Sequence, residues 1–151
     1  MSSCIFIASD SSLPEFAPLK EYHVTIDVDK GIVFDGRADD YYFLREFAEA
    51  SFYSGKRHGV SLEWDYTDGR AKQIINYIKN ALKEIQSVEL WKVWLTEYYE
   101  FEDRPLIHRK EISVDELTKE HIREIDNGKI WDHRDKTYPE RPSFYCLKIN
   151  R

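Results

Sequence analysis

The sequence predicts an α+β fold in which a mostly antiparallel sheet, of about five to seven strands, packs against helices. Two kinds of pattern lead to this prediction. Several segments alternate apolar and polar residues, as half-buried strands do, and one segment places apolar residues at intervals of three and four, as an amphipathic helix does. At 151 residues the chain has the length of one ordinary domain, so we expect a single globular domain over residues 1–151.

The composition is that of a folded chain with an aromatic core. Hydrophobic residues make up 42% and charged residues 33%, which excludes a disordered segment, and the aromatic share of 15% indicates that rings dominate the core. No segment approaches the uninterrupted apolar run of about 18 residues that a membrane helix needs. The first residues lack the basic start and full hydrophobic region of a secretion signal, so we expect a cytoplasmic protein.

Five regions carry strand patterns. Residues 22–28 place Tyr22, Val24, Ile26 and Val28 on one face, which predicts a half-buried strand that returns after Gly31 as a hairpin. Residues 60–66 alternate in the same way. Residues 88–96 are apolar on both faces for part of their length, which is typical of a central strand. A return strand at 106–112 and a terminal strand at 143–149 complete the predicted sheet.

The predicted long helix covers about residues 69–86, with Asp68 as its cap, because the apolar positions recur over four turns. Those positions are Ala71, Ile74, Ile75, Ile78, Ala81, Leu82 and Ile85. A shorter helix starts at the capping pattern from Ser113 or at Thr118, and Gly128 ends it. Residues 39–50 fit a short helix capped by Asp39, and a strand is the alternative.

Two cysteines, Cys4 and Cys146, are too few for a disulfide scaffold. They lie in the first and last apolar runs, and would be neighbours only if the two ends of the chain pair in the sheet. We interpret both as buried thiols.

The net charge of −6 lies in the N-terminal third of the chain. Residues 1–50 hold ten carboxylates and four basic groups, whereas the rest holds equal numbers of each sign. An acidic protein without a basic block repels a phosphate backbone, which argues against nucleic acid as a partner. A basic protein would be attracted.

No motif with the residue types and spacing of a known chemistry is present. The Asp27–Gly31 segment starts like a calcium loop, but Ile32 and Ala38 stand where such a loop needs Gly and Glu. His121 with Glu124 is too small a set for a metal, and the segment Asp-His-Arg-Asp at 132–135 lacks a nucleophile. Nucleotide loops and serine-hydrolase elbows are absent. We therefore expect no cofactor and no metal, and the sequence favours a protein that is not an enzyme.

Two segments are candidate binding surfaces. In residues 97–105 the rings of Tyr98, Tyr99 and Phe101 alternate with acidic residues that include Glu100 and Glu102. In residues 129–142 a long charged connection contains Trp131 and His133. Aromatic residues are enriched in binding hot spots, although the sequence favours the simpler interpretation that these rings fold back on the edge of the core.

The sequence leaves three hypotheses for the function. The first is a protein-interaction or inhibitor-like module that binds a basic partner through acidic and aromatic surfaces. The alternative is an enzyme or small-molecule binder with a cleft between the sheet and the segments 97–105 and 129–142. The third is a homodimer in which exposed rings pair with themselves.

Overall fold

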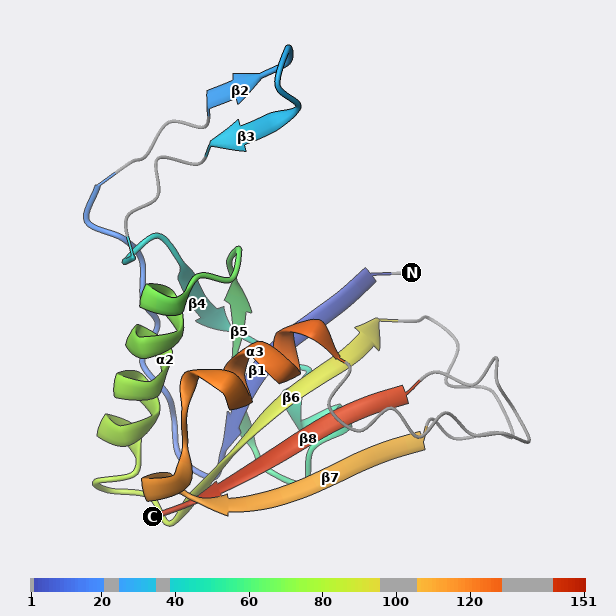
Figure 1. Cartoon of the computed structure of the whole chain (residues 1–151). Coiled ribbons are helices and arrows are strands. Elements are labelled where there is room, and N and C mark those ends of the chain that lie inside the picture. The colour runs from blue at the N-terminus through green and yellow to red at the C-terminus, as the bar shows by residue number, and fades with distance from the viewer. Residues whose placement is uncertain (1, 21–24, 35–38, 96–105, 129–142) are drawn as a thin grey trace.

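The computed structural model describes residues 2–20, 25–34, 39–95, 106–128 and 143–151 of the chain (Figure 1). The strands are β1 (Ser2–Ser9), β2 (Thr25–Asp27), β3 (Ile32–Phe34), β4 (Phe43–Glu46), β5 (His58–Glu63), β6 (Ser87–Leu95), β7 (Leu106–Ser113) and β8 (Ser143–Asn150). The helices are α1 (Ala50–Tyr53), α2 (Asp68–Ala81) and α3 (Lys119–Asn127), with one 3₁₀ turn, η1 (Val114–Glu116). The fold is α+β, as the sequence predicts.

Six strands form one sheet in the order β4-β5-β1-β6-β8-β7, and β2 pairs with β3 as a separate hairpin. Neighbouring strands of the large sheet are antiparallel except for β7 and β8, which are parallel, so the sheet is mixed. Parallel neighbours need a crossover connection, and here it includes η1 and α3. The segment at 106–112 is a strand, β7, as predicted. It does not pair with β6, because β8 lies between the two strands.

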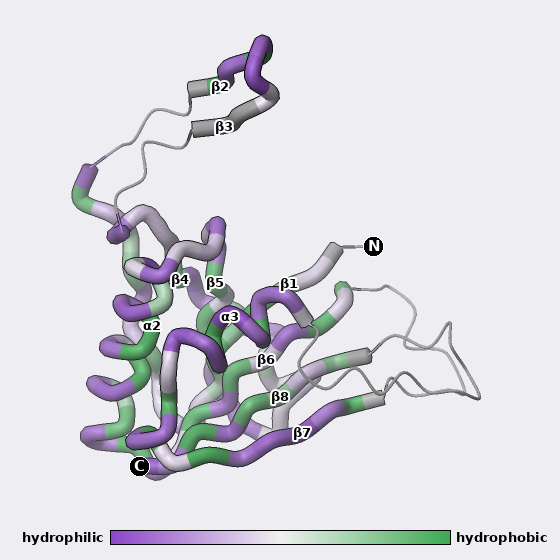
Figure 2. Tube along the Cα trace, in the orientation of Figure 1, coloured by the Kyte–Doolittle hydropathy of each residue, from purple (hydrophilic) through white to green (hydrophobic). Residues whose placement is uncertain are grey.

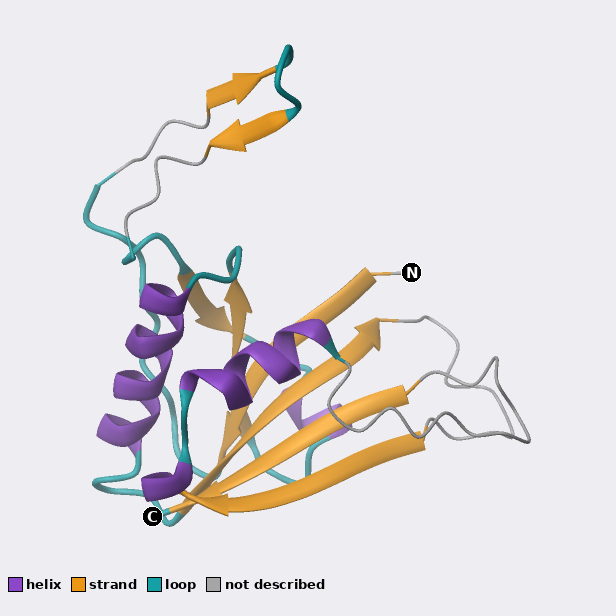
Figure 3. Cartoon of the chain, viewed as in Figure 1, coloured by secondary structure: helices purple, strands orange, loops and turns teal. Residues whose placement is uncertain are grey.

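Helices α2 and α3 cover the same face of the sheet, as Figure 3 shows. Strands β5 and β6 both run antiparallel to β1, so they are parallel to each other, and α2 makes the crossover between them. Helix α3 lies in the second crossover, from β7 to β8. Both helices bury apolar side chains in the core on this face, and α3 packs on β6 and on α2.

The helix side of the core confirms the predicted stripe. On α2 the side chains of Ile74 and Ile78 are fully buried, and on α3 those of Ile122 and Ile125 are almost fully buried. They pack on one apolar layer of the sheet, which consists of Ile7, Leu44, Val60, Leu62, Val88, Leu90, Ile112, Tyr145, Leu147 and Ile149. Figure 2 shows the same apolar concentration along β6, β8 and the inner side of α2.

The opposite face of the sheet carries an aromatic layer. Phe6 and Trp91 stack with ring centroids 6.0 Å apart, and Phe6 also contacts Phe47 and Tyr53 at 5.0 and 5.7 Å. Phe144 meets Tyr53 edge-on at 5.9 Å. The short α1 covers these rings through Ala50 and Tyr53. The high aromatic content therefore builds the second half of the core.

Helix boundaries differ slightly from the prediction. Thr67, and not Asp68, is the N-cap of α2, because its side chain accepts a hydrogen bond from the Arg70 N–H. The helix ends at Ala81, before the predicted limit near residue 86, although Leu82 is still buried against the core. Helix α3 uses the second predicted start, with a capping box between Thr118 and His121. Gly128 ends it with φ +61°, as expected for a left-handed C-cap.

Two local predictions are corrected. Residues 43–46 form strand β4, so the helical alternative for this stretch is wrong, and helix begins only at Ala50. The hairpin at Gly31 exists, but the predicted apolar face is exposed at its two described residues, while Tyr22 and Val24 lie outside the described residues. Ile26 is 64% exposed and Val28 is 84% exposed, because the hairpin lies outside the large sheet. An alternating pattern indicates a strand with one apolar and one polar face, but it does not indicate whether the apolar face is buried by another element.

The two cysteines are free thiols on different strands. Strand β6 separates β1 from β8, so Cys4 pairs with Val93 and Cys146 pairs with Trp91 on the two sides of β6. Burial raises the pKa of Cys4 to about 11 and that of Cys146 to about 12. Both thiols are therefore protonated in the folded protein near neutral pH.

Replacing Ile78 by Ala tests the packing of α2. We expect Ile78→Ala to lower the free energy of unfolding by about 2–5 kcal/mol, because a fully buried side chain is lost and a cavity remains. Urea denaturation followed by far-UV circular dichroism measures the change. The exposed neighbour Lys79 serves as the control, and Lys79→Ala should change the free energy by less than about 0.5 kcal/mol. Equal losses in both variants would contradict the packing described above.

Alkaline pH tests the burial of Cys146. An unfolded thiol loses its proton near its ordinary pKa of 9.0, whereas the folded one keeps it to about 12. The folded state binds more protons in this interval, so stability is intact below pH 9 and falls by about 1.4 kcal/mol per pH unit above it. Urea unfolding as a function of pH should show a shallower alkaline loss for Cys146→Ala. An identical slope in both proteins would contradict the assignment.

Candidate functional site

All seven side chains that the sequence nominates for binding lie outside the described residues: Tyr98, Tyr99, Glu100, Phe101, Glu102, Trp131 and His133. The strands that carry these two segments can be placed. Lys92 near the end of β6 pairs with Tyr145 near the start of β8, and Leu106 pairs with Ser143. The segments 96–105 and 129–142 are therefore attached at one end of the sheet.

A Lys–Asp cluster lies among the described residues at this end. The Lys92 ammonium donates a hydrogen bond to the Asp126 backbone carbonyl, and the Trp64 indole N–H donates to the Asp126 carboxylate at 3.2 Å. Burial lowers the pKa of Lys92 and raises the pKa of Asp126. Both shifts favour the neutral forms, which is the direction that acid–base chemistry uses.

The surroundings of the cluster are tightly packed. A Cβ on Gly128 would lie 3.4 Å from the Lys92 side chain and 3.5 Å from the Tyr145 ring, so the lysine stem fits between them. His108 stacks on Tyr145 with ring centroids 5.1 Å apart. These contacts fix the C-terminus of α3 on the sheet. The cluster therefore has a structural role whether or not it meets a ligand.

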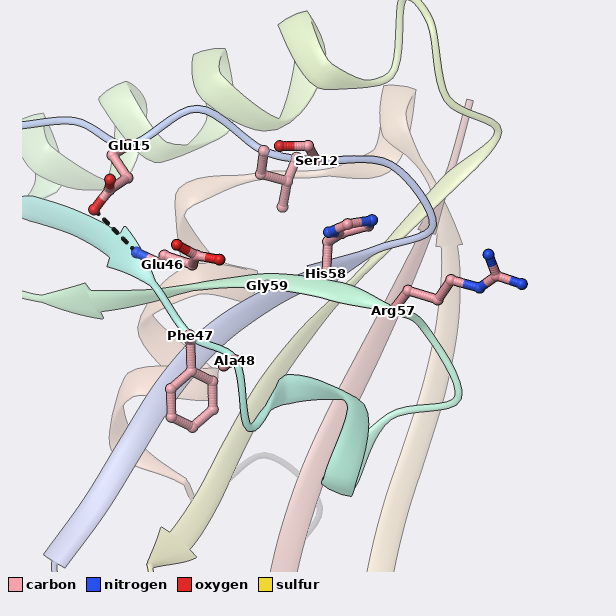
Figure 4. A pocket seen from close by; sticks show the side chains of 9 residues that line it. Ser12, Glu15, Glu46, Phe47, Ala48, Arg57, His58 and Gly59 are labelled. Atoms are coloured by element: carbon pink, nitrogen blue, oxygen red, sulfur yellow. Dashed lines mark hydrogen bonds between the residues drawn. The ribbon is translucent and has the colours of Figure 1, made fainter.

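A small polar pocket lies away from the Lys–Asp cluster, where β4 and β5 meet the segment after β1 (Figure 4). Its volume is about 250 Å³. Pockets for drug-sized ligands usually measure about 300–1,000 Å³, so this one has room for a single side chain or a similar small group. It is lined by Ser12, Leu13, Glu15, Glu46, Phe47, Ala48, Arg57, His58 and Gly59.

Backbone pairing brings the two glutamates of this pocket together. Phe16 bridges to Leu44, which places the segment after β1 alongside β4. The Glu46 N–H then donates a hydrogen bond to the Glu15 carboxylate at 3.1 Å. The Tyr77 hydroxyl of α2 donates to the Pro14 carbonyl at 2.6 Å and holds the same segment from the helix side.

Among the described residues, no cation forms an ion pair with either of the two carboxylates, Glu15 or Glu46, whereas five other carboxylates are paired in this way. Figure 4 shows both glutamates at one end of the pocket and the Arg57 side chain directed away from them. Leu13 and Phe47 add apolar surface to the lining. The pocket is thus suited to an alkyl chain that ends in a positive charge.

Sequence reasoning missed this pair. Glu15 and Glu46 are 31 residues apart and lie in no common motif. The one available signal was the excess of carboxylates in residues 1–50. That excess gives the amount of negative charge. Which carboxylates share a pocket is determined by the pairing of the segment after β1 with β4.

Unlike Glu15 and Glu46, which are exposed, Glu89 is a buried carboxylate. Glu89 is 9% exposed on the aromatic face, where it accepts hydrogen bonds from the Ser54 hydroxyl at 2.8 Å and the Trp91 indole N–H at 3.3 Å. These bonds satisfy a group whose unpaired burial would be costly. Among the residues that the structure describes, no group of three His, Cys, Asp or Glu side chains could hold a metal ion.

The geometry defines an α+β protein with a mixed six-stranded sheet and a small acidic pocket at the β4 side. Comparison with protein-family models, with curated proteins and with solved structures gives no match for the chain. Over the residues described, the structure contains no helix that is both long and apolar enough to span a membrane.

Proposed function

We propose that this chain is a protein-interaction module that binds a basic partner protein. The observation that carries the proposal is the pocket between β4, β5 and the segment after β1, in which Glu15 and Glu46 lack a cation partner among the described residues. An Arg or Lys side chain of the partner would supply the missing charge. Such side chains are frequent anchors of protein interfaces.

The distribution of charge supports the same partner. The net charge of −6 arises in residues 1–50, which contribute both pocket carboxylates. A surface with one sign of charge attracts the opposite sign at long range and accelerates association. It also repels a second copy of itself, which argues against the homodimer, and it repels a phosphate backbone. As part of this proposal the protein is cytoplasmic, where free thiols such as Cys146 remain reduced.

Affinity capture with the intact chain as bait tests the proposal. We expect a basic protein to be retained at about 50 mM salt and released at about 0.5 M, since the Debye length shortens from over 10 Å to below 5 Å. The double variant Glu15→Gln, Glu46→Gln keeps the shape of both side chains and removes their charge. It should bind the captured protein at least about tenfold more weakly, as measured by titration calorimetry.

The matched control is Glu84→Gln, which removes one exposed carboxylate distant in sequence from the pocket. It should bind within about twofold of the unmodified chain, because an exposed charge away from an interface contributes little. Failure to retain any basic protein at low salt would refute the interaction module. Equal weakening by both substitutions would show that net charge, and not the pocket, governs binding.

A second candidate function is small-molecule binding at the sheet end that carries the segments 96–105 and 129–142. The favouring observation is the half-buried pair of Lys92 and Asp126, whose pKa shifts favour the neutral forms. A thermal-shift screen against metal ions, nucleotides and sugars tests it. A true ligand at 100 times its dissociation constant stabilises the folded chain by about 2.7 kcal/mol. That shift should disappear in Lys92→Met, and a panel without any shift would remove support for this candidate.

A further inference from the structure

The hairpin of β2 and β3, residues 25–34, is called the arm here, and it exposes apolar side chains away from the core. Ile26 is 64% exposed and Val28 is 84% exposed. Leu19, just before the arm, is 98% exposed. Figure 1 shows the arm beyond the sheet, on the side of β4 and away from β7 and β8. Ile26 and Val28 are only two residues apart, and exposed apolar side chains that lie close together mark interaction sites more often than singly scattered ones do.

The turn of the arm is well defined. Asp27 accepts a hydrogen bond from the Lys30 N–H at 3.1 Å, and Gly31 adopts φ +63°. Ile26 pairs with Val33 and Asp27 pairs with Ile32 across the two strands. Successive strand residues point to opposite faces, so Ile26 and Asp27 face opposite sides of the arm. Val28 and Asp29 are both exposed in the turn, so apolar and acidic side chains lie next to each other at the tip of the arm.

An isolated two-stranded hairpin is marginally stable in water, and it becomes stable when its apolar side is covered. The carboxylates near the tip of the arm limit what can cover it. Among the described residues, Asp27 is paired only with Lys30, at 3.9 Å and in an exposed position, and Asp29 has no ion pair. A cover must therefore offer apolar contact and tolerate or neutralise negative charge.

Two common covers fit poorly. A membrane with anionic headgroups would repel Asp29 as its exposed neighbour Val28 approached the surface. A second copy would bring together two N-terminal thirds, each with ten carboxylates against four basic groups. A protein surface with an apolar groove edged by Lys or Arg satisfies both requirements at once.

We propose that the arm docks into an apolar groove, edged by basic residues, on the partner protein, with Ile26 and Val28 as its apolar anchors. This inference rests on the proposed function and assigns that function a second contact surface beside the pocket. Both surfaces belong to the acidic third of the chain, so one basic partner can engage them together. Two such contacts on one rigid partner would reinforce each other through effective concentration.

The test is site-specific photo-cross-linking with benzoylphenylalanine placed at position 26, at position 28 or at position 52 of the full chain. Phe52 lies on α1 and is 65% exposed, so it is a matched exposed site away from the arm. We expect positions 26 and 28 to cross-link to the basic protein that is retained in the affinity capture, and position 52 to give no such product. Equal products at all three positions, or none at 26 and 28, would overturn the docking site.

Substitutions measure the strength of the contact. We expect Ile26→Ser with Val28→Ser to raise the dissociation constant for the captured protein at least about tenfold, chiefly through faster dissociation. Asp27→Asn with Asp29→Asn should slow association and reduce its salt dependence. Phe52→Ser should leave both rates unchanged. Unaltered melting curves in all variants would show that the large sheet is intact, since the arm lies outside it.

The remaining occupants are tested directly. If the chain sediments with vesicles of phosphatidylcholine and phosphatidylserine, the inference is overturned in favour of a membrane. If light scattering shows a dimer that Ile26→Ser with Val28→Ser abolishes, it is overturned in favour of a second copy. If the unmodified chain retains a basic protein through Glu15 and Glu46 and the arm variants bind it equally well, the arm proposal fails and the proposed function stands. If no basic protein is retained at all, the proposed function itself fails.

Discussion

The rest of the structure depends on the burial of β6 on both of its faces. Val88 and Leu90 point to the helix side and Trp91 and Val93 to the aromatic side, and all four are at most 1% exposed. A strand that is apolar on both faces is stable only between two covering layers. Helices α2 and α3 supply one layer, and the rings beneath α1 supply the other.

The two layers are built in different ways because the connections differ. Both crossovers place a full amphipathic helix on the first face, so aliphatic side chains fill it. Among the described residues, the second face is covered by the short α1, which offers few aliphatic side chains, and large rings such as Phe6 and Trp91 fill the space. Polar groups within this layer, such as Glu89, are retained because Ser54 and Trp91 satisfy them.

The proposed interaction surfaces lie where this layered core ends. The pocket of Glu15 and Glu46 forms at the β4 edge of the sheet, and the arm leaves the fold on the same side. Edge positions are open to water, so carboxylates there can stay charged without the desolvation cost that the interior imposes. Negative charge and exposed apolar groups can therefore occur together at this edge, which is the combination that a basic partner with an apolar groove would recognise.

Local patterns in the sequence determined the elements: the stripe from Ala71 to Leu82, the two-faced strand β6 and the glycine that ends α3 each depend on neighbours a few residues away. Only the tertiary structure decided which face was covered and which distant residues met. In the folded chain β8 lies between β6 and β7, Ile26 is exposed to water, and the Glu46 N–H donates a hydrogen bond to the Glu15 carboxylate. The periodicity of a segment shows which face of a strand or helix is apolar. The residues that bury this face are brought to it by pairing between strands far apart in the chain, which no local pattern encodes.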